Sequence, residues 1–311
     1  MILSVSRRTD IPAFYSEWFM NRIRDKYVMV RNPMNYHQVS RISLTPEVVD
    51  CIVFWSKNPA PLIPLLKEIE KDYPFYFQYT LNAYDADIEP NLPSLEDRIR
   101  TFRSLAEEYG KEHVIWRYDP IILSEKYDTP WHTAEYSYLA DQLTGYTDCC
   151  VFSFVDMYDK VRRNMTGLGC RDITARQQAE IASVVHAIAE NHHIELRSCA
   201  EEIDLDSLGI THSRCIDPDL IKKIIGCPIR AKKDTAQRGY CQCVESIDIG
   251  QYNTCRHGCK YCYANFSNKT VIENALAHNP KSPLIVGWPE TDDKITDRKV
   301  NSIKDEQISL F

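Results

Sequence analysis

A short stretch near the carboxyl end carries three cysteines at a spacing that suits a metal cluster. Cys255, Cys259 and Cys262 form a Cys-x-x-x-Cys-x-x-Cys array, and Tyr261 directly precedes the third cysteine. Thiolates of this kind hold iron–sulfur clusters, and a complete [4Fe–4S] site takes four of them. Three ligands would leave one iron without a protein ligand, and an open metal position can bind a substrate or cofactor. The alternative is a zinc site that a distant fourth cysteine completes.

Four further cysteines lie before this array and could form a second metal site. Cys199, Cys215, Cys241 and Cys243 would supply the full ligand set of a closed [4Fe–4S] cluster. Zinc also accepts four thiolates, and spacing alone does not separate the two metals. The chain has 12 cysteines but is not a small secreted domain, so clustered cysteines favour metal binding over disulfide bonds.

Short apolar runs rich in β-branched and aromatic residues alternate with longer segments of helical spacing over the first two thirds of the chain. Strands that are apolar throughout and separated by helices indicate a parallel sheet covered on both faces. The strands are expected at residues 2–5, 27–31, 51–55, 75–80, 113–118, 149–155 and 194–197, and the helices at residues 14–25, 60–72, 94–109, 131–143 and 174–191.

This alternation predicts an α/β fold, namely a complete or partial (β/α) TIM-like barrel over residues 1–198. No Gly-x-Gly-x-x-Gly follows any expected strand, which argues against a dinucleotide-binding fold. A cysteine-rich iron–sulfur module is expected over residues 199–267, and residues 268–311 are expected to form a polar carboxyl-terminal tail.

Charged and polar residues follow almost every expected strand. Barrel enzymes carry their active sites at the carboxyl ends of the strands, so we expect these residues to line one site. A ring of buried cations is stable only beside carboxylates or an anionic ligand, which indicates a ligand bearing phosphate or carboxylate groups. Some of these residues could instead cap the helices that follow. The expected catalytic residues are Arg7, Asp10, Lys57, Arg117 and Asp119, and the expected cofactor-binding residues are Arg8, Arg31, Asn58, Arg197, Glu201 and Tyr261.

The composition is that of an ordinary globular protein, with 311 residues of which 44% are hydrophobic and 26% charged. A net charge of −7 argues against sequence-independent nucleic-acid binding by the whole surface, although residues 222–238 form a local basic stretch. No run reaches the roughly 18 apolar residues that a membrane span needs. The first residues turn basic too soon for a secretory signal peptide, so we expect a cytoplasmic protein.

Nearly the whole chain resembles a bacterial family known only as a domain of unknown function. The resemblance rests on residues 4–12 (SVSRRTDIP), residues 54–59 (FWSKNP), and Gln237 and Arg238 leading to residues 246–250 (SIDIG). This resemblance implies no activity.

The cysteine array itself resembles the signature of radical S-adenosylmethionine (SAM) enzymes, and its string Cys-x-His-Gly-Cys-x-Tyr-Cys-Tyr is most similar to the spore photoproduct lyase type. In that superfamily the amino and carboxylate groups of SAM chelate the open iron. The resemblance implies a [4Fe–4S] cluster on Cys255, Cys259 and Cys262, SAM as cofactor, and a 5′-deoxyadenosyl radical that abstracts hydrogen from the substrate. The chain departs from that superfamily because the array follows the last expected strand rather than the first, and no Gly-Gly-Glu-like segment follows the second.

The last residues resemble the bacterial sliding-clamp-binding peptide, in which a glutamine forms hydrogen bonds and a Leu-Phe pair fills an apolar pocket. Gln307, Leu310 and Phe311 stand at those positions, and Ile308 replaces a leucine. The resemblance implies docking on a sliding clamp, since polar tails of this kind order on binding. A terminal Leu-Phe pair could also pack on its own domain.

These features favour an iron–sulfur enzyme of the radical SAM type that acts in nucleic-acid repair or modification. The alternative is a non-catalytic iron–sulfur or zinc protein associated with DNA and the sliding clamp, in which the metal only stabilises the fold. A hydrolase of phosphate esters ranks last, because the sequence carries no evident set of histidine and carboxylate metal ligands. The oligomeric state is not predicted.

Overall fold

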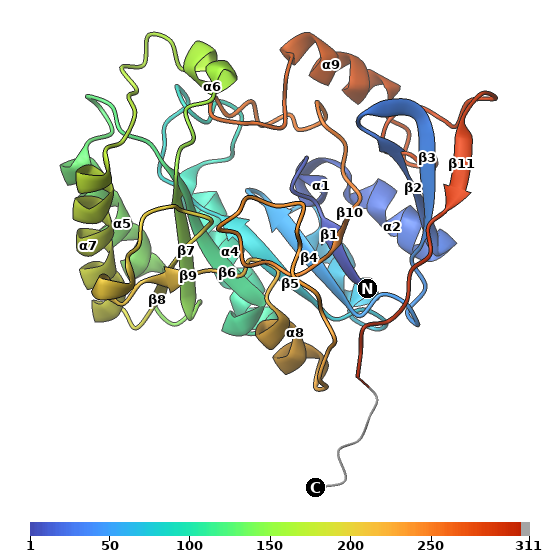
Figure 1. Ribbon diagram of the computed structural model, residues 1–311, viewed down its shortest axis with the longest axis horizontal. Helices are drawn as coiled ribbons and strands as arrows, with labels where there is room; N and C mark the ends of the chain where they lie inside the picture. Colours follow the sequence, from blue (N-terminus) through green and yellow to red (C-terminus); the bar gives the residue numbers. More distant parts are fainter. Residues whose placement is uncertain (306–311) are drawn as a thin grey trace, which may run out of the picture.

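The computed structural model describes residues 1–305, which form an α/β fold around a large parallel sheet. Within these residues, 8 strands pair in the order β10-β1-β4-β5-β6-β7-β8-β9, and each neighbouring pair is parallel (Figure 1). The strands are β1 (Ile2–Val5), β4 (Cys51–Ser56), β5 (Phe75–Thr80), β6 (Val114–Ile121), β7 (Cys149–Phe154), β8 (Glu195–Ser198), β9 (Thr211–His212) and β10 (Ile247–Asp248). Gln307, Leu310 and Phe311, the expected clamp-binding residues, lie outside the described residues.

The central strands are buried on both faces, which explains why their sequences are apolar throughout. In β4 and β5, Phe54 and Phe77 belong to one hydrophobic cluster, whereas Val53 and Tyr76 belong to another. Since successive residues of a strand point to opposite faces, the two clusters lie on opposite sides of the sheet. The expected α/β fold with a parallel sheet is therefore confirmed.

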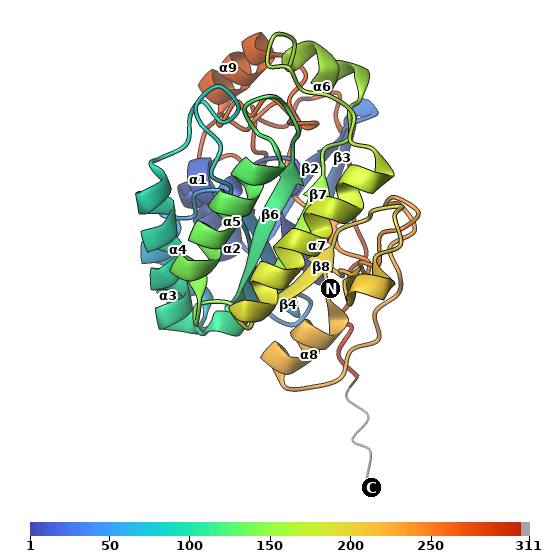
Figure 2. The same ribbon diagram turned by 90° about the vertical axis from the view of Figure 1, so that its left-hand side faces the viewer.

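Helices cover the face that carries Phe54 and Phe77, and Figure 2 shows several of them in front of the strands. The helices of this layer are α1 (Ile11–Phe14), α2 (Ser16–Asp25), α3 (Leu66–Ile69), α4 (Leu95–Tyr109), α5 (Thr129–Leu143) and α7 (Ala175–Asn191). On the opposite face, which we call the inner face, α8 (Pro218–Ile225) packs with residues of the cysteine-rich segment. Within the described residues, no helix has both the length and the apolar content that a membrane crossing requires.

Two short helices lie at the end of the molecule towards which the strands of the main sheet run (Figure 2). They are α6 (Asp159–Asn164), which follows β7, and α9 (Asn268–Ala277), which follows the three-cysteine array. Residues 199–267 contribute β9 and β10, which extend the two edges of the main sheet. The cysteine-rich segment is thus built into the sheet at both edges.

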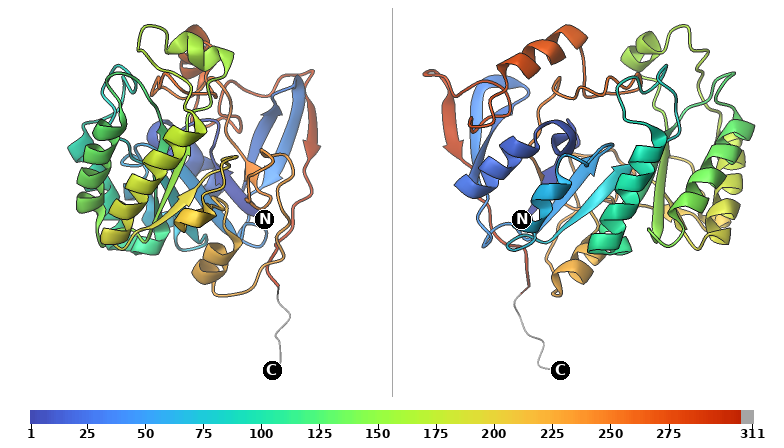
Figure 3. Two further views of the ribbon diagram at one scale, coloured as in Figure 1. Left: turned by 60° about the vertical axis from the view of Figure 1, so that its left-hand side comes forward. Right: turned by 180° about the vertical axis from the view of Figure 1, so that it is seen from behind.

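A second, three-stranded sheet consists of β2 (Tyr27–Asn32), β3 (Asn35–Ser43) and β11 (Lys294–Asp297), which lie side by side in both views of Figure 3. The expectation that residues 27–31 form a strand of the main sheet is wrong, because β2 pairs antiparallel with β3. Pro33 and Met34 form a tight turn that brings β3 directly beside β2. β2 therefore pairs with β3 and not with a strand of the main sheet.

Candidate functional site

The array of Cys255, Cys259 and Cys262, here called the three-cysteine loop, follows β10 and emerges beside the carboxyl end of β1. The carboxylate of Asp248 in β10 accepts hydrogen bonds from Ser6 Oγ (2.6 Å) and the Arg7 amide (2.8 Å), which joins the two strand ends. The parallel pairing of β10 with β1 therefore starts the loop at the carboxyl edge of the main sheet.

The three-cysteine loop then crosses to the segment that follows β5. The Asn91 side-chain amide donates to the Arg256 carbonyl at 2.9 Å, and the Asn91 backbone amide donates to the His257 carbonyl at 3.3 Å. The Lys260 amide donates to the Ile88 carbonyl at 3.0 Å. The loop is thus fixed across the carboxyl ends of β1, β4 and β5, where α/β enzymes bind their ligands.

Asp10 connects this loop to the ends of β1 and β4. Its carboxylate lies 2.8 Å from His257 Nε2 and accepts hydrogen bonds from Ser56 Oγ (2.7 Å), the Lys57 amide (2.8 Å) and the Ala13 amide (3.0 Å). Burial alone would raise the pKa of Asp10, but the hydrogen bond and charge of His257 and the Lys57 amide hold it below its usual value. Asp10 therefore caps α1, as the structural alternative expects, and also anchors the loop.

Glu89 forms a second buried anchor, between the loop and the main sheet. Its side chain is fully buried, its Oε1 lies 2.8 Å from Lys57 Nζ, and it accepts a hydrogen bond from the Tyr261 hydroxyl. Arg98 Nη1 lies 3.7 Å from the other carboxylate oxygen. Burial alone would raise the pKa of Glu89, but Lys57 and Arg98 keep it below its usual value. The carboxylate thus stays charged between two cations.

The thiols of the three-cysteine loop lie close enough to interact electrostatically, and all three cysteines are partly buried. Burial raises the pKa of Cys255 well above its usual value, and Cys262 and Asp10 add to this effect. Burial also raises the pKa of Cys259, although Lys57 acts in the opposite direction. A desolvated thiol releases its proton readily only when a metal ion takes the place of that proton. These environments suit metal ligands better than nucleophiles.

On the inner face, two arginines enclose Trp55. The guanidinium carbons of Arg7 and Arg117 lie 5.0 Å and 5.3 Å from the centre of the Trp55 ring. Arg117 also forms an ion pair with Asp119 at 2.5 Å, and Ser153 donates a hydrogen bond to the same carboxylate. Burial alone would raise the pKa of Asp119, but Arg117 and Ser153 lower it. Three expected site residues therefore meet on this face.

The four cysteines that precede the loop also meet on the inner face, and we call them the four-cysteine group. Cys199 Sγ lies 3.4 Å from Cys215 Sγ, and Arg117 Nη1 lies 2.9 Å from Cys215 Sγ. Cys243 interacts with both Cys215 and Cys241, and its hydrogen bond lowers the pKa of Cys241 to about 7. The structure brings together all four residues of this expected set.

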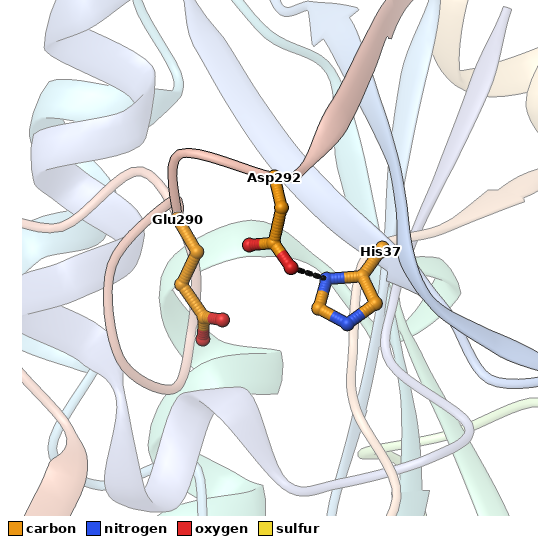
Figure 4. A group of neighbouring side chains, drawn as sticks. All are labelled: His37, Glu290 and Asp292. Carbon is orange, nitrogen blue, oxygen red and sulfur yellow. Dashed lines mark ion pairs between the residues drawn. The ribbon is translucent and has the colours of Figure 1, made fainter.

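One other set of side chains lies close enough to share a single metal ion. His37, Glu290 and Asp292 place their ligand atoms within 4.8 Å of one another, and no other group of three such residues does so within residues 1–305 (Figure 4). These side chains are exposed, and His37 Nδ1 already pairs with Asp292 at 3.3 Å. An exposed acidic group of this kind is no evidence of a metal site.

Arg31 does not lie with the other expected site residues. It belongs to β2 of the small sheet, where its guanidinium pairs with Asp293 and lies 4.1 Å from the ring centre of Tyr36. The expectation that Arg31 lines the same site is wrong, because β2 pairs with β3 instead of entering the main sheet.

Arg8 and Asn58 lie beside the carboxyl edge but contact their own neighbours. The Arg8 guanidinium carbon is 5.3 Å from the ring centre of Tyr252, which precedes the three-cysteine loop. The Asn58 amide donates to Ser56 Oγ at 3.0 Å in the turn that follows β4. Arg8 is therefore oriented towards the loop, whereas Asn58 stabilises a turn.

Arg197 and Glu201 line two different cavities. Arg197 binds Glu195 at 2.8 Å and lines a cavity of about 290 Å³ together with Asp148, which directly precedes β7. Glu201 lines a cavity of about 450 Å³ together with Arg238, beyond the carboxyl end of β8. Burial raises the pKa of Glu201 to about 7. Arg197 therefore faces the opposite end of the sheet from the three-cysteine loop.

The sequence analysis did not single out four residues that organise the site. His257 lies inside the cysteine array, and Trp55 and Asp248 lie in stretches that carry the family resemblance. The position of these three residues in the sequence could therefore have marked them as site candidates. Glu89 had none, because it follows β5 in a polar loop and its partners come from distant segments.

A family model for a domain of unknown function, DUF1848, matches residues 2–264. The chain belongs to this family, which confirms the resemblance drawn from residues 4–12 and 246–250. The match runs from β1 to just beyond the three-cysteine loop.

Curated proteins give no match to the chain. Among solved structures, a proposed α-L-fucosidase from Bacteroides thetaiotaomicron is 12% identical, with 57% of this chain and 82% of that chain covered and a TM-score of 0.24. So low a TM-score supports no conclusion about fold or function.

Proposed function

We propose that this member of the DUF1848 family is a radical SAM-type enzyme, with a [4Fe–4S] cluster on Cys255, Cys259 and Cys262. The observation that carries the proposal is the parallel pairing of β10 with β1. In the superfamily that the cysteine signature resembles, the cluster loop follows the first strand. Here it follows the last strand, but that strand is the neighbour of the first. The loop therefore starts from an equivalent edge position although its order in the chain differs.

The strand order also supports the finer proposal of a partial (β/α) barrel. From β4 to β9 each strand of the main sheet lies next to its predecessor, and β10 returns to β1, which is the order of a barrel opened between β9 and β10. A hydrogen bond of 3.3 Å from the Val244 amide to the Ile216 carbonyl joins the segments beside these two edges. The inner face would then be the barrel interior.

The thiol arrangement fits an iron–sulfur cluster better than zinc. Tetrahedral zinc has Zn–S distances of about 2.3 Å, which requires sulfur atoms about 3.8 Å apart. Within the described residues, no three cysteines have their sulfur atoms all within 4.8 Å of one another. In a [4Fe–4S] cluster each thiolate binds a different iron, so the thiols are spread over a larger volume. Lys57 beside Cys259 compensates part of the negative charge that such a cluster adds.

A reduced cluster held by Cys255, Cys259 and Cys262 would supply the electron for reductive cleavage of SAM, and with it the radical chemistry that removes a hydrogen atom from the substrate. The protein contributes position and shielding. Asp10 and Glu89 fix the loop against the sheet, and Lys57 keeps its charge because Glu89 binds it at 2.8 Å. Tyr261 is partly buried, and its hydroxyl donates a hydrogen bond to Glu89.

The proposed substrate is a nucleic acid that requires repair or modification. This part of the proposal rests on the similarity of the cysteine string to the photoproduct lyase type and of residues 307–311 to a clamp-binding peptide. Three basic residues of α6 give it local support, since Lys160 lies beside the loop, 3.4 Å from the Tyr263 carbonyl, and Arg162 and Arg163 follow it.

The first test is anaerobic purification followed by reduction with dithionite, with and without SAM. We expect an electron paramagnetic resonance signal that shifts on adding SAM, and 5′-deoxyadenosine among the products. Cys259→Ala should abolish the SAM-dependent shift of the signal and the formation of 5′-deoxyadenosine, while the circular dichroism spectrum stays unchanged. Cys227→Ala is the matched control, because Cys227 belongs to neither cysteine set, and it should retain both readouts.

A cluster signal that is indifferent to SAM, with no 5′-deoxyadenosine, would overturn the proposal. If Cys259→Ala also unfolded the chain, the three cysteines would instead stabilise the fold, as the non-catalytic alternative requires.

A further inference from the structure

The four-cysteine group supplies four converging thiols that the proposed reaction does not use. We propose that Cys199, Cys215, Cys241 and Cys243 hold a second [4Fe–4S] cluster with four protein ligands, which binds no SAM. This inference goes beyond the proposed function and stands on different residues, so that either can fail alone.

The four thiols come from three separate segments that the two edges of the main sheet bring together. Cys199 directly follows β8, Cys215 follows β9, and Cys241 and Cys243 precede β10. Cys199 and Cys215 have their sulfur atoms 3.4 Å apart, which is contact distance and well beyond the roughly 2.05 Å of a disulfide bond. A ligand that binds all four thiols would connect the free edges at β9 and β10.

The buried Arg117 and the partly buried Arg7 supply the positive charge that a cluster with four thiolates needs. Arg117 Nη1 lies 2.9 Å from Cys215 Sγ, and Arg117 is only 4% exposed. Arg7 interacts electrostatically with Cys215, Cys241 and Cys243. The Nη2 atom of Arg7 is buried and has no hydrogen-bond partner within residues 1–305. A buried donor without a partner is costly, and an anionic cluster beside it would remove that cost.

The four sulfur atoms form an extended set rather than a compact one. The contacts form an open chain, from Cys199 to Cys215, to Cys243 and then to Cys241. No three of these sulfur atoms are all within 4.8 Å of one another, whereas tetrahedral zinc would require six sulfur–sulfur distances of about 3.8 Å. A [4Fe–4S] cluster, in which each iron takes one thiolate, would require Cys199 and Cys215 to move apart from their 3.4 Å contact, and sulfide analysis of the purified protein distinguishes it from zinc.

Hydrogen bonds to the sulfur atoms would tune the reduction potential of this cluster. The Ile216 amide donates to Cys243 Sγ at 3.4 Å, and Arg117 donates to Cys215 Sγ. Donors of this kind stabilise the more negative, reduced state and raise the reduction potential. Reduction by dithionite would add one electron to the cluster, and no bond in the protein would change.

The test uses the full chain with Cys255, Cys259 and Cys262 all changed to Ala, purified anaerobically. We expect it to retain about four irons and four sulfides per chain, and to show an electron paramagnetic resonance signal after reduction that SAM does not alter. Adding Cys215→Ala and Cys243→Ala should remove this iron and sulfide. Arg117→Gln should shift the midpoint potential of the remaining cluster to a lower value.

Bound zinc without sulfide would overturn the inference, and so would iron that survives the loss of Cys215 and Cys243. If the variant with all five substitutions does not fold, Mössbauer spectroscopy of the triple variant replaces this test. A triple variant that lacks the spectrum of a [4Fe–4S] cluster with four cysteine ligands would also overturn the inference. Failure of SAM cleavage in the wild-type chain would leave this result unaffected and would count against the proposed function alone.

Discussion

Glu89 shows how a single buried carboxylate fixes both the loop and a cation of the candidate site. It accepts hydrogen bonds from Lys57 Nζ and the Tyr261 hydroxyl, and Arg98 lies 3.7 Å away. Its side chain is 0% exposed, so water does not screen its negative charge. Breaking a buried pair from one side leaves an uncompensated charge, which costs more than the pair itself contributes.

Glu89→Gln should therefore lower the free energy of unfolding, measured in urea, by about 3 kcal/mol, because Lys57 and Arg98 lose their buried counter-charge. The matched control is Glu68→Gln. Glu68 is 44% exposed and pairs with Arg24 on the surface, so its loss should cost less than about 1 kcal/mol. Equal effects of the two substitutions would contradict the role assigned to Glu89.

At the level of elements, the strands of the main sheet that are apolar throughout could be predicted closely. The expected strands 2–5 and 75–80 coincide with β1 and β5, and the expected strand 51–55 falls one residue short of β4. Burial on both faces makes such runs visible in a single sequence. The two-residue strands β9 and β10 carry no local sequence pattern, so they could not be predicted. The prediction placed β2 in the main sheet, whereas the turn after β2 sets β3 as its partner.

The pairing of β10 with β1 depends on close approach at Gly250. A Cβ atom at this position would lie 2.0 Å from Ser6 Oγ and 2.7 Å from Ser6 Cβ. Gly250→Ala should therefore destabilise the protein by about 2 kcal/mol, measured by urea unfolding, and lower the iron bound per chain. Gly239→Ala is the control, because its Cβ would meet no atom within 4 Å, and it should change stability by less than about 0.5 kcal/mol. Identical unfolding midpoints for the two variants would rule out the steric argument.

At the scale of the whole molecule, the sequence could predict which residue types gather but not every partner. Arg7 and Lys57 follow strands of one parallel sheet and Arg117 lies in the carboxyl half of a third, so their proximity follows from the pattern alone. The contacts of Glu89 and His257 could not be predicted, because each joins segments that are far apart in the chain. Such pairings are decided by tertiary packing, and no local signal marks them.

The expected binding of residues 307–311 to a sliding clamp also concerns the whole molecule. Deleting residues 307–311 should weaken binding to a purified bacterial sliding clamp at least tenfold, measured by surface plasmon resonance, and leave the unfolding midpoint unchanged. The control is Ile308→Leu, which restores the leucine of the resembled peptide and should bind at least as tightly as wild type. Unchanged clamp binding after the deletion would refute the expected docking.

The bond between Asp10 and His257 joins residues 247 positions apart, and this separation has a consequence for biosynthesis. A ribosome releases the amino-terminal residues first, so Asp10 emerges long before the cysteines that it helps to position. The loop cannot settle against its anchors until the last strand of the sheet has left the exit tunnel. Loading of the proposed cluster on these cysteines would therefore be a late event, after nearly all of the main sheet has been synthesised.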